Sequence, residues 1–155
     1  MTPSLSLDDL RVDDAMEMVD VLSAPALYEF TGGAAPSLPE LQARYEAQVA
    51  GSGDADEQWR NWIVRIDGQA VGFVQATVTT GAATLAWVIG APWQGRGHAT
   101  SAVGAMIRIL VSEGVGVFDA WIAPGHAASE RVAGRAGSVA TGEIDADGEV
   151  RWTSA

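Results

Sequence analysis

Residues 86–100 read Ala-Trp-Val-Ile-Gly-Ala-Pro-Trp-Gln-Gly-Arg-Gly-His-Ala-Thr, and this is the most informative part of the sequence. It begins with a run typical of a strand, passes through a glycine-rich turn and continues into apolar residues at helical spacing. Gly95 and Gly97 let the backbone approach a ligand closely, and Arg96 between them adds a cation. Successive N–H groups in front of a helix N-terminus favour an anion. The stretch therefore predicts a phosphate or pyrophosphate site.

Two common nucleotide-binding patterns do not fit this stretch. Gly90 and Gly95 match the glycines of a Walker loop, but Arg96 and Gly97 stand where that loop has Lys and Ser or Thr. A dinucleotide fingerprint requires a third glycine where this chain has Thr100, and it opens a parallel β-α-β unit. The preceding segments here predict hairpin strands instead.

The segments on either side predict a mixed sheet with helices. Asp67-Gly68 separates two strand-like runs and favours a tight hairpin. Hydrophobic spacing predicts strands at 5–7, 59–66, 70–79, 84–89, 117–122, 139–144 and 149–153, and helices at 13–22, 37–49, 97–113 and 127–136. The order β-α-α-β-β-β-α-β-α-β-β predicts an α+β fold, and the length predicts a single domain over residues 1–155.

In this setting Gln94-x-x-Gly97-x-Ala99 has the form Q/R-x-x-G-x-G/A, which resembles the acetyl-coenzyme A loop of the GNAT superfamily of N-acetyltransferases. The resemblance covers residues 5–152 and is closest to the ribosomal-protein N-terminal acetyltransferase branch. It implies a mixed central sheet, an antiparallel meander plus a parallel pair splayed at the cofactor site, flanked by helices. It also implies that acetyl-CoA is held by Trp87, Val88, Ile89, Gln94, Gly95, Arg96, Gly97, His98, Ala99, Thr100, His126 and Ser129.

The resemblance implies direct transfer, in which an amine attacks the thioester and no acyl-enzyme forms. A backbone N–H between Trp87 and Ile89 is the candidate to polarise the carbonyl. Ser129 is the candidate proton donor to the thiolate, or it orients the pantetheine, and capping of its helix is the alternative. The chain departs from the family pattern twice, because His126 replaces the usual Asn and Ala133 stands where many members have a Tyr acid.

The general base is left open by the sequence. The strand at 84–89 has no carboxylate, so Glu29, Asp119 or a water chain remains, and alternation places Asp119 on a solvent face. Residues 28–30 lie in a loop that resembles the acceptor-side loop of the family. The predicted acceptor-binding residues are Tyr28, Glu29, Phe30 and Trp121.

Charge is distributed unevenly along the chain, whose formal net charge is −11. Residues 1–67 hold 13 acidic residues and four arginines, whereas residues 68–138 hold three acidic residues and four arginines. The middle of the chain therefore suits an anionic ligand, and the ends suit a cationic amine acceptor. The acidic balance argues against a nucleic-acid partner. An acidic surface that serves only solubility is the alternative.

Composition excludes several kinds of chemistry. The chain has no cysteine and no lysine, which excludes thiolate metal sites, a cysteine nucleophile and a Schiff base. Its two histidines are too few for a histidine-rich metal centre, and Asp145–Glu149 fits a hairpin turn better than a calcium loop, so no metal is expected. The start, MTPSLSLDDL, lacks the features of a secretory signal. We expect a cytoplasmic protein without a membrane partner, and a homodimer is left open.

The predicted function is that of an acetyl-CoA-dependent N-acetyltransferase acting on a primary amine, either a small molecule or a protein or peptide N-terminus. The alternative is a GNAT-fold protein that binds acyl-CoA without catalysis, as a sensor or binding module. The absence of the Tyr acid and of a carboxylate on the strand at 84–89 favours this alternative.

Overall fold

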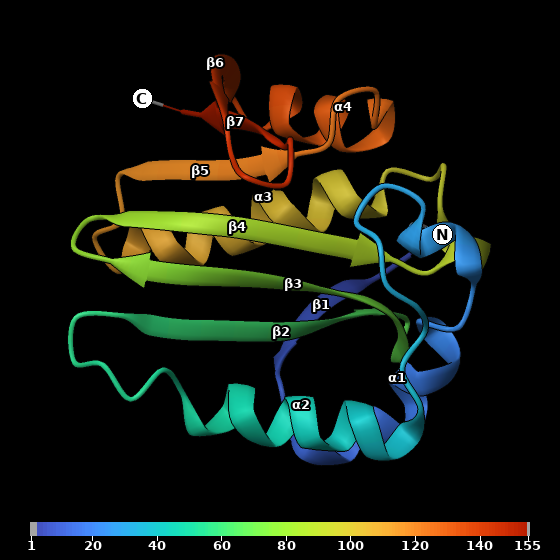
Figure 1. The fold of residues 1–155 in the computed structure, drawn as a ribbon. Helices are drawn as coiled ribbons and strands as arrows, with labels where there is room; N and C mark the ends of the chain where they lie inside the picture. Colours follow the sequence, from blue (N-terminus) through green and yellow to red (C-terminus); the bar gives the residue numbers. More distant parts are fainter. Residues whose placement is uncertain (1–2, 155) are drawn as a thin grey trace.

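Seven strands form one sheet with helices packed on both faces, in a computed structural model that describes residues 3–154 (Figure 1). The strands are β1 (Leu5–Asp9), β2 (Gln58–Ile66), β3 (Gln69–Thr79), β4 (Ala82–Ile89), β5 (Val117–Ile122), β6 (Val139–Ile144) and β7 (Val150–Thr153). The α-helices are α1 (Ala15–Val21), α2 (Leu38–Ala50), α3 (His98–Ser112) and α4 (Ala127–Arg135). Short 3-10 turns occupy Val12–Asp14, Pro25–Tyr28 and Ala91–Trp93. The predicted order of elements is confirmed, and residues 1–2 and 155 of the predicted domain lie outside the described residues.

The strand order across the sheet is β1-β2-β3-β4-β5-β7-β6. Strands β1 to β4 form an antiparallel meander, and β4 and β5 are a parallel pair. Asp67 and Gly68 join β2 to β3 with φ of 50° and 86°, the left-handed values that a type I′ hairpin turn requires. The last hairpin inserts β7 beside β5 and leaves β6 at the edge. The predicted α+β class with a mixed sheet is confirmed.

The two faces of the sheet support two hydrophobic clusters. Helix α3 lies behind the strands in Figure 1 and buries Val103, Met106 and Leu110 against one face. Helices α1 and α2 contribute Met18 and Leu41 to a second cluster. Because side chains alternate along a strand, neighbouring residues of β2 feed the two clusters separately. We call the side covered by α1 and α2 the α1/α2 face.

A capping box starts α2, as the Ser-x-x-Glu spacing of Ser37 and Glu40 in the sequence predicts. The Glu40 N–H donates to Ser37 Oγ at 3.3 Å, and the Ser37 N–H donates to Glu40 Oε1 at 3.1 Å. These reciprocal bonds satisfy two N–H groups that a helix start leaves without partners. They also keep the Glu40 carboxylate occupied at the beginning of the helix.

Strands β4 and β5 pair only where they begin. Their parallel register covers three residue pairs and ends at Thr84–Asp119, although β4 continues to Ile89 and β5 to Ile122. The two strands therefore diverge toward the ends at which the glycine-rich loop and α4 follow. This confirms the splayed parallel pair. No helix within residues 3–154 combines the length and the apolar character needed to cross a bilayer.

Candidate active site

The glycine-rich loop joins β4 to α3 at the open end of the β4–β5 gap. Gly95 and Gly97 have φ of 76° and 81°, in the left-handed region that favours glycine, and Gly97 is the N-cap of α3. Within the described part of the chain, no atom lies within 4 Å of a Cβ built on either glycine, so this backbone faces open space. The first N–H groups of α3, at residues 98–100, have no acceptor inside the helix. This geometry fits phosphate oxygens, and Arg96 is exposed beside it.

Two contacts fix the base of the loop. Gln94 Nε2 donates to the carbonyl of Ile89 at 2.8 Å, which folds the loop back onto β4. The Gly90 N–H donates to the carbonyl of Val71 on β3 at 2.8 Å. A Cβ on Gly90 would lie 2.8 Å from the Trp93 ring, so only glycine fits at this junction. The predicted roles of these loop residues toward a cofactor stay predictions, but the loop is held in one shape.

The end of β4 forms one wall of the gap. Trp87 and Val88 are half-buried and Ile89 is buried. Trp87 packs against the small cluster of Ala120, Ile122 and Ala133 beneath α4. In the part of β4 beyond Thr84, the described residues of β5 provide no register partner, so backbone groups on that side are free to meet a ligand.

Phe30, His126 and Ser129 meet at the turn between β5 and α4. The Phe30 and His126 rings are stacked, with centroids 4.3 Å apart and planes 6° apart. Ser129 Oγ lies 3.3 Å from His126 Nε2, so among the described residues its hydroxyl contacts an imidazole and does not form the helix cap that was the alternative to its role as proton donor. Burial lowers the pKa of His126, although the charges of Glu130 and Glu29 oppose this. A neutral imidazole can accept the Ser129 proton or donate to its oxygen.

Asp119 departs from the expectation of a solvent-facing side chain. Only 17% of its side chain is exposed, and Oδ2 lies 3.0 Å from Arg151 Nη2. Its Oδ1 is buried without a hydrogen-bond partner among the described residues. Alternation did place Asp119 on the less buried side of β5, but β7 lies beside β5 and supplies Arg151, which pairs with the carboxylate and reduces its exposure. An aspartate committed to an ion pair is the weaker of the two proposed carboxylate bases.

The residues of the acceptor-side loop differ in how far they are buried. Tyr28 Oη donates to the carbonyl of Leu22 at 2.7 Å, and burial raises the pKa of Tyr28. Glu29 is exposed, and its charge is felt by His126. The structure thus brings Phe30, Glu29 and the β5–α4 turn together across the chain. Trp121 is half-buried and pairs with Arg151 in the ladder, which puts it on the face that carries Asp119.

A cavity that the sequence did not indicate lies between α2 and the sheet. Its volume is about 180 Å³, and we call it the inner cavity. Apolar side chains of Leu10, of Leu22 just after α1, and of α2, β2 and β3 form much of its wall. Its polar lining comes from Arg44, Tyr45, Gln48, Asn61 and Gln75. These residues are separated by many positions in the chain, so no motif spacing could reveal them.

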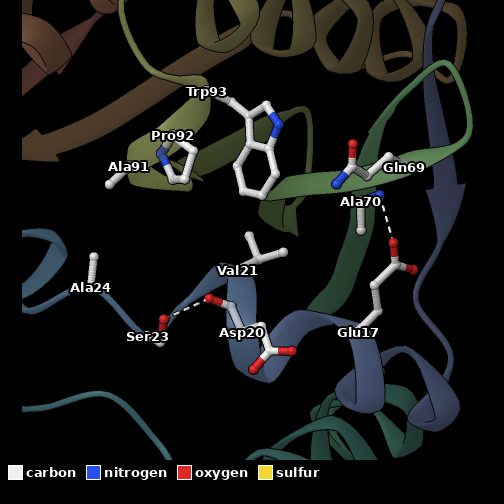
Figure 2. A pocket seen from close by; sticks show the side chains of 10 residues that line it. All are labelled: Glu17, Asp20, Val21, Ser23, Ala24, Gln69, Ala70, Ala91, Pro92 and Trp93. Carbon is white, nitrogen blue, oxygen red and sulfur yellow. Dashed lines mark hydrogen bonds between the residues drawn. The ribbon is translucent and has the colours of Figure 1, made fainter.

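A second, larger cavity lies between α1 and the turn after β4, and Figure 2 shows its lining. Its volume is about 350 Å³, and Trp93 points toward Val21 across it. Glu17 accepts from the Ala70 N–H at 2.9 Å and pairs with Arg65, which lowers the pKa of Glu17. This carboxylate ties α1 to the β2–β3 hairpin, which is a structural role.

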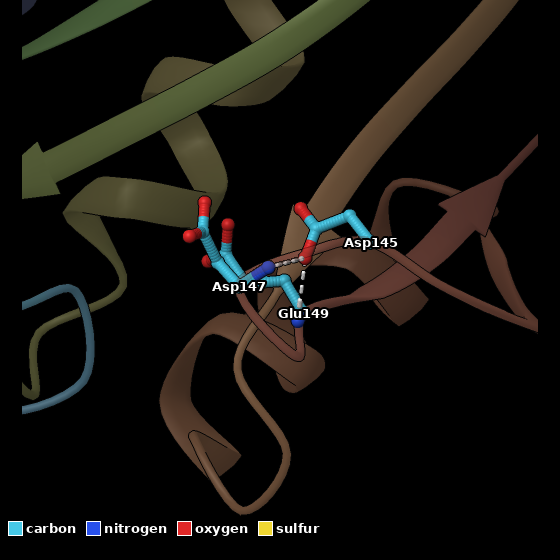
Figure 3. A group of neighbouring side chains, drawn as sticks. All are labelled: Asp145, Asp147 and Glu149. Atoms are coloured by element: carbon cyan, nitrogen blue, oxygen red, sulfur yellow. Dashed lines mark hydrogen bonds between the residues drawn. The ribbon is translucent and has the colours of Figure 1, made fainter.

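The acidic residues of the last hairpin make the contacts of a turn, as predicted (Figure 3). Asp145 Oδ1 accepts from the N–H groups of Asp147 and Glu149 at 3.0 and 2.9 Å. The three carboxylates offer oxygens within 4.8 Å of one another. Burial, followed by the charges of Asp145 and Asp147, raises the pKa of Glu149. The cluster therefore stabilises the β6–β7 turn.

Comparison with known proteins assigns the family. Residues 4–139 match a family model described as an acetyltransferase (GNAT) domain. No curated protein matches the sequence. The fold is similar to the aminoglycoside acetyltransferase AAC(6')-Ib solved with coenzyme A, at 21% identity, covering 97% of this chain and 94% of that chain, with a TM-score of 0.81.

Two further solved structures show the same fold. RimL, a ribosomal alpha-N-protein acetyltransferase in complex with coenzyme A, is 14% identical over 97% of this chain and 92% of that chain, with a TM-score of 0.83. An acetyltransferase from Thermus thermophilus is 18% identical over 97% and 96% of the two chains, with a TM-score of 0.77. The chain belongs to the GNAT acetyltransferase family, which confirms the fold predicted from the order of its elements and the class of enzyme predicted from the Gln94–Ala99 motif in that setting.

Proposed function

We propose that this chain, as one GNAT domain over residues 1–155, transfers an acetyl group from acetyl-CoA to a primary amine by direct attack. The observation that carries the proposal is the open, left-handed Gly95–Gly97 backbone at the start of α3, placed at the mouth of the β4–β5 gap. Two structures with similar folds contain coenzyme A. Acetyl-CoA would supply an activated thioester, and the chain supplies the groups around it.

The pyrophosphate is assigned to the N–H groups of the loop and of residues 98–100, with Arg96 as the cation nearest to them. The remaining loop contacts are assigned to Gln94, His98, Ala99 and Thr100. Backbone N–H groups of Trp87–Ile89 polarise the thioester carbonyl, since β4 has no ladder partner there in the described chain. This arrangement holds the donor along the gap with its acyl end over β4.

Proton transfer is assigned to the cluster at the β5–α4 turn. Ser129 donates to the departing thiolate, and His126 orients the hydroxyl through the 3.3 Å contact. Glu29, exposed and close enough for its charge to act on His126, is the proposed base for the incoming ammonium. The acceptor amine enters beside Tyr28, Phe30 and Trp121. Its positive charge suits the strongly acidic first 67 residues.

Steady-state release of coenzyme A thiol with a panel of primary amines tests the proposal. Turnover with at least one amine, together with calorimetric binding of coenzyme A, is the expected result. Binding without turnover on any amine would favour the alternative, an acyl-CoA-binding protein without catalysis. Ala133 in α4 and the absence of a carboxylate on β4 are the features that support that alternative. The cytoplasmic location and the homodimer stay predictions of the sequence.

A further inference from the structure

The inner cavity contains a buried phenol that has no protein partner. Tyr45 is 4% exposed and projects from α2 into the cavity, and its Oη is without a hydrogen-bond partner among the described residues. Burial raises the pKa of Tyr45 far above its ordinary value, so the hydroxyl keeps its proton and can donate it in a hydrogen bond. A buried hydroxyl without a partner is costly, which makes this atom a sign of a ligand contact.

The other polar groups of the cavity can also donate hydrogen bonds. Asn61 and Gln75 are half-buried on β2 and β3, and no hydrogen bond joins their side-chain amides to other residues in 3–154. Arg44 stands exposed at the rim and forms no ion pair within 4 Å in the same range. Hydroxyl, amide and guanidinium groups all offer N–H or O–H donors. Their common partner is a group rich in oxygen.

The charge of the lining narrows this partner further. The lining contains one arginine and no acidic side chain, in a chain with 20 acidic residues. Glu40, one helical turn before Arg44, is held in the capping box of α2. Arginine with additional donors is the arrangement that proteins use for carboxylates. The lining offers a cationic group no carboxylate, only the amide oxygens of Gln48, Asn61 and Gln75 and the Tyr45 oxygen, whereas a carboxylate meets both the arginine and the neutral donors.

The register of the sheet relates the cavity to the end of β4. Asn61 pairs with Gln75, and Gln75 pairs with Ala86, so these three residues lie in one row on the α1/α2 face. Ala86 lies just beyond Thr84, the last β4 residue that pairs with β5. Neighbouring strands are about 4.8 Å apart, so the floor of the cavity lies roughly 5–10 Å from the proposed position of the thioester.

We propose that the inner cavity binds a carboxylate of the acceptor. The preferred substrate is then a molecule that carries both a primary amine and a carboxylate, with the amine at β4 and the carboxylate beneath α2. The inference rests on the proposed function and names its substrate class. The volume of about 180 Å³ is smaller than the roughly 300–1,000 Å³ of pockets for drug-sized ligands, so only a small end group enters.

The test compares acceptors that differ only at the end opposite the amine. We would measure kcat/KM for ω-amino acids of two to six carbons, for their carboxamides and for alkylamines of equal length. The acids should exceed the matched carboxamides by roughly tenfold or more, given the strength of hydrogen bonds to charged groups. Equal or better turnover of the carboxamides would overturn the carboxylate assignment.

Two variants locate the effect in the cavity. Tyr45→Phe and Arg44→Gln should each reduce the preference for acids over carboxamides. Arg108→Gln, which removes the same charge from an exposed position on α3, should retain the preference. Tyr45→Phe should also keep or raise the melting temperature, because it removes an unpaired buried hydroxyl. A preference that survives both cavity variants would overturn the proposal.

Calorimetry separates this inference from the proposed function. N-acetylated ω-amino acids mimic the product and bind without turnover, and coenzyme A is titrated separately. If coenzyme A fails to bind, while the N-acetylated ω-amino acids bind to the wild type and bind more weakly to Tyr45→Phe, the proposed function is wrong and the cavity assignment stands. If coenzyme A binds and amines are acetylated, but the acids bind no better than their carboxamides, the cavity assignment alone is wrong.

Discussion

Gly97 has a left-handed backbone conformation and lies next to open space. Its φ of 81° is strained for any side chain, and open space surrounds the position where a Cβ would project. The steric clash that usually explains a glycine is absent from the described surroundings. The open space is instead where the proposed pyrophosphate meets the backbone. A side chain at this position would therefore act on the ligand more than on the protein.

Gly97→Glu should raise the dissociation constant of coenzyme A by about 100-fold or more, because a like charge beside a phosphate costs several kcal/mol and each 1.4 kcal/mol is tenfold. Calorimetric titration measures the effect. Gly53→Glu is the matched control, since Gly53 has a similar φ of 76° and equally open surroundings in the described chain, in a turn far from the loop. Unchanged affinity in folded Gly97→Glu would remove the basis of the cofactor assignment.

His126 should make stability depend on pH. Its folded pKa is lowered by burial, so the unfolded chain takes up a proton first, near pH ~6.5. The contribution of His126 is therefore complete above that pH and is lost as the pH falls toward its folded pKa. His126→Gln should flatten the fall in melting temperature between pH 7 and 5. An identical slope in wild type and His126→Gln would contradict the burial of a neutral ring.

The sequence could predict the residues of the loop but not those of the inner cavity. Gln94, Gly97 and their neighbours are adjacent in the chain, so their spacing carries the chemistry. Tyr45, Asn61 and Gln75 come from three elements, and they meet only after α2 packs on the sheet. Their separate contexts are those of an ordinary amphipathic helix and two ordinary strands, which is why sequence reasoning passed over them.

At the scale of elements, local signals succeeded where the interactions are local. The Asp67-Gly68 turn and the Ser37–Glu40 capping box depend on residues within a few positions of one another, and both are confirmed. The environment of Asp119 depends on Arg151, 32 residues later, so alternation placed Asp119 on the less buried side of β5 but could not predict the ion pair that leaves its side chain only 17% exposed. Alternation predicts the face on which a side chain lies, but not which strand will pair with it and supply its partner.

Ser37→Ala should lower the free energy of unfolding by about 1 kcal/mol, within the range of roughly 0.5–2 kcal/mol for the loss of a helix cap. The physical reason is the loss of the acceptor for the Glu40 N–H. Urea denaturation measures the change. Ser112→Ala is the control, because that hydroxyl only bonds back to the carbonyl of Ile109 within α3 and its loss should change little. Equal stability of wild type and Ser37→Ala would show that α2 is fixed by packing alone.

At the scale of the whole molecule, the segments proposed to bind the donor and the acceptor differ in net charge. The central part of the sequence, near neutral, forms β3, β4, α3 and β5 around the proposed donor site, while the acidic first 67 residues form α1, α2 and the acceptor-side loop. The glycine-rich loop that would hold the anionic donor contains Arg96 and no acidic residue. A protonated amine is attracted toward the loop at residues 28–30, and a carboxylate on the same acceptor needs the single arginine at the rim of the inner cavity.

This division predicts a salt effect on acceptor binding. For an alkylamine, which carries a positive charge and no carboxylate, KM should rise severalfold with ionic strength while kcat changes little. The reason is screening, since the Debye length falls from about 8 Å at 0.15 M to about 3 Å at 1 M salt. Steady-state kinetics across this range measures the effect. A KM independent of salt would mean that the acidic surface serves only solubility.

Variants of Glu29 test whether this one carboxylate, or the acidic region as a whole, attracts the cationic amine. Glu29→Gln should raise KM for the alkylamine and reduce its salt dependence, because the exposed carboxylate lies in the acceptor-side loop. Glu46→Gln removes the same charge from an exposed position on α2 and should leave both quantities nearly unchanged. If Glu29 is also the base, Glu29→Gln lowers kcat as well, and the loss is greatest where the amine is mostly protonated. Equal effects of the two variants would assign the attraction to the overall charge of the region instead of to Glu29.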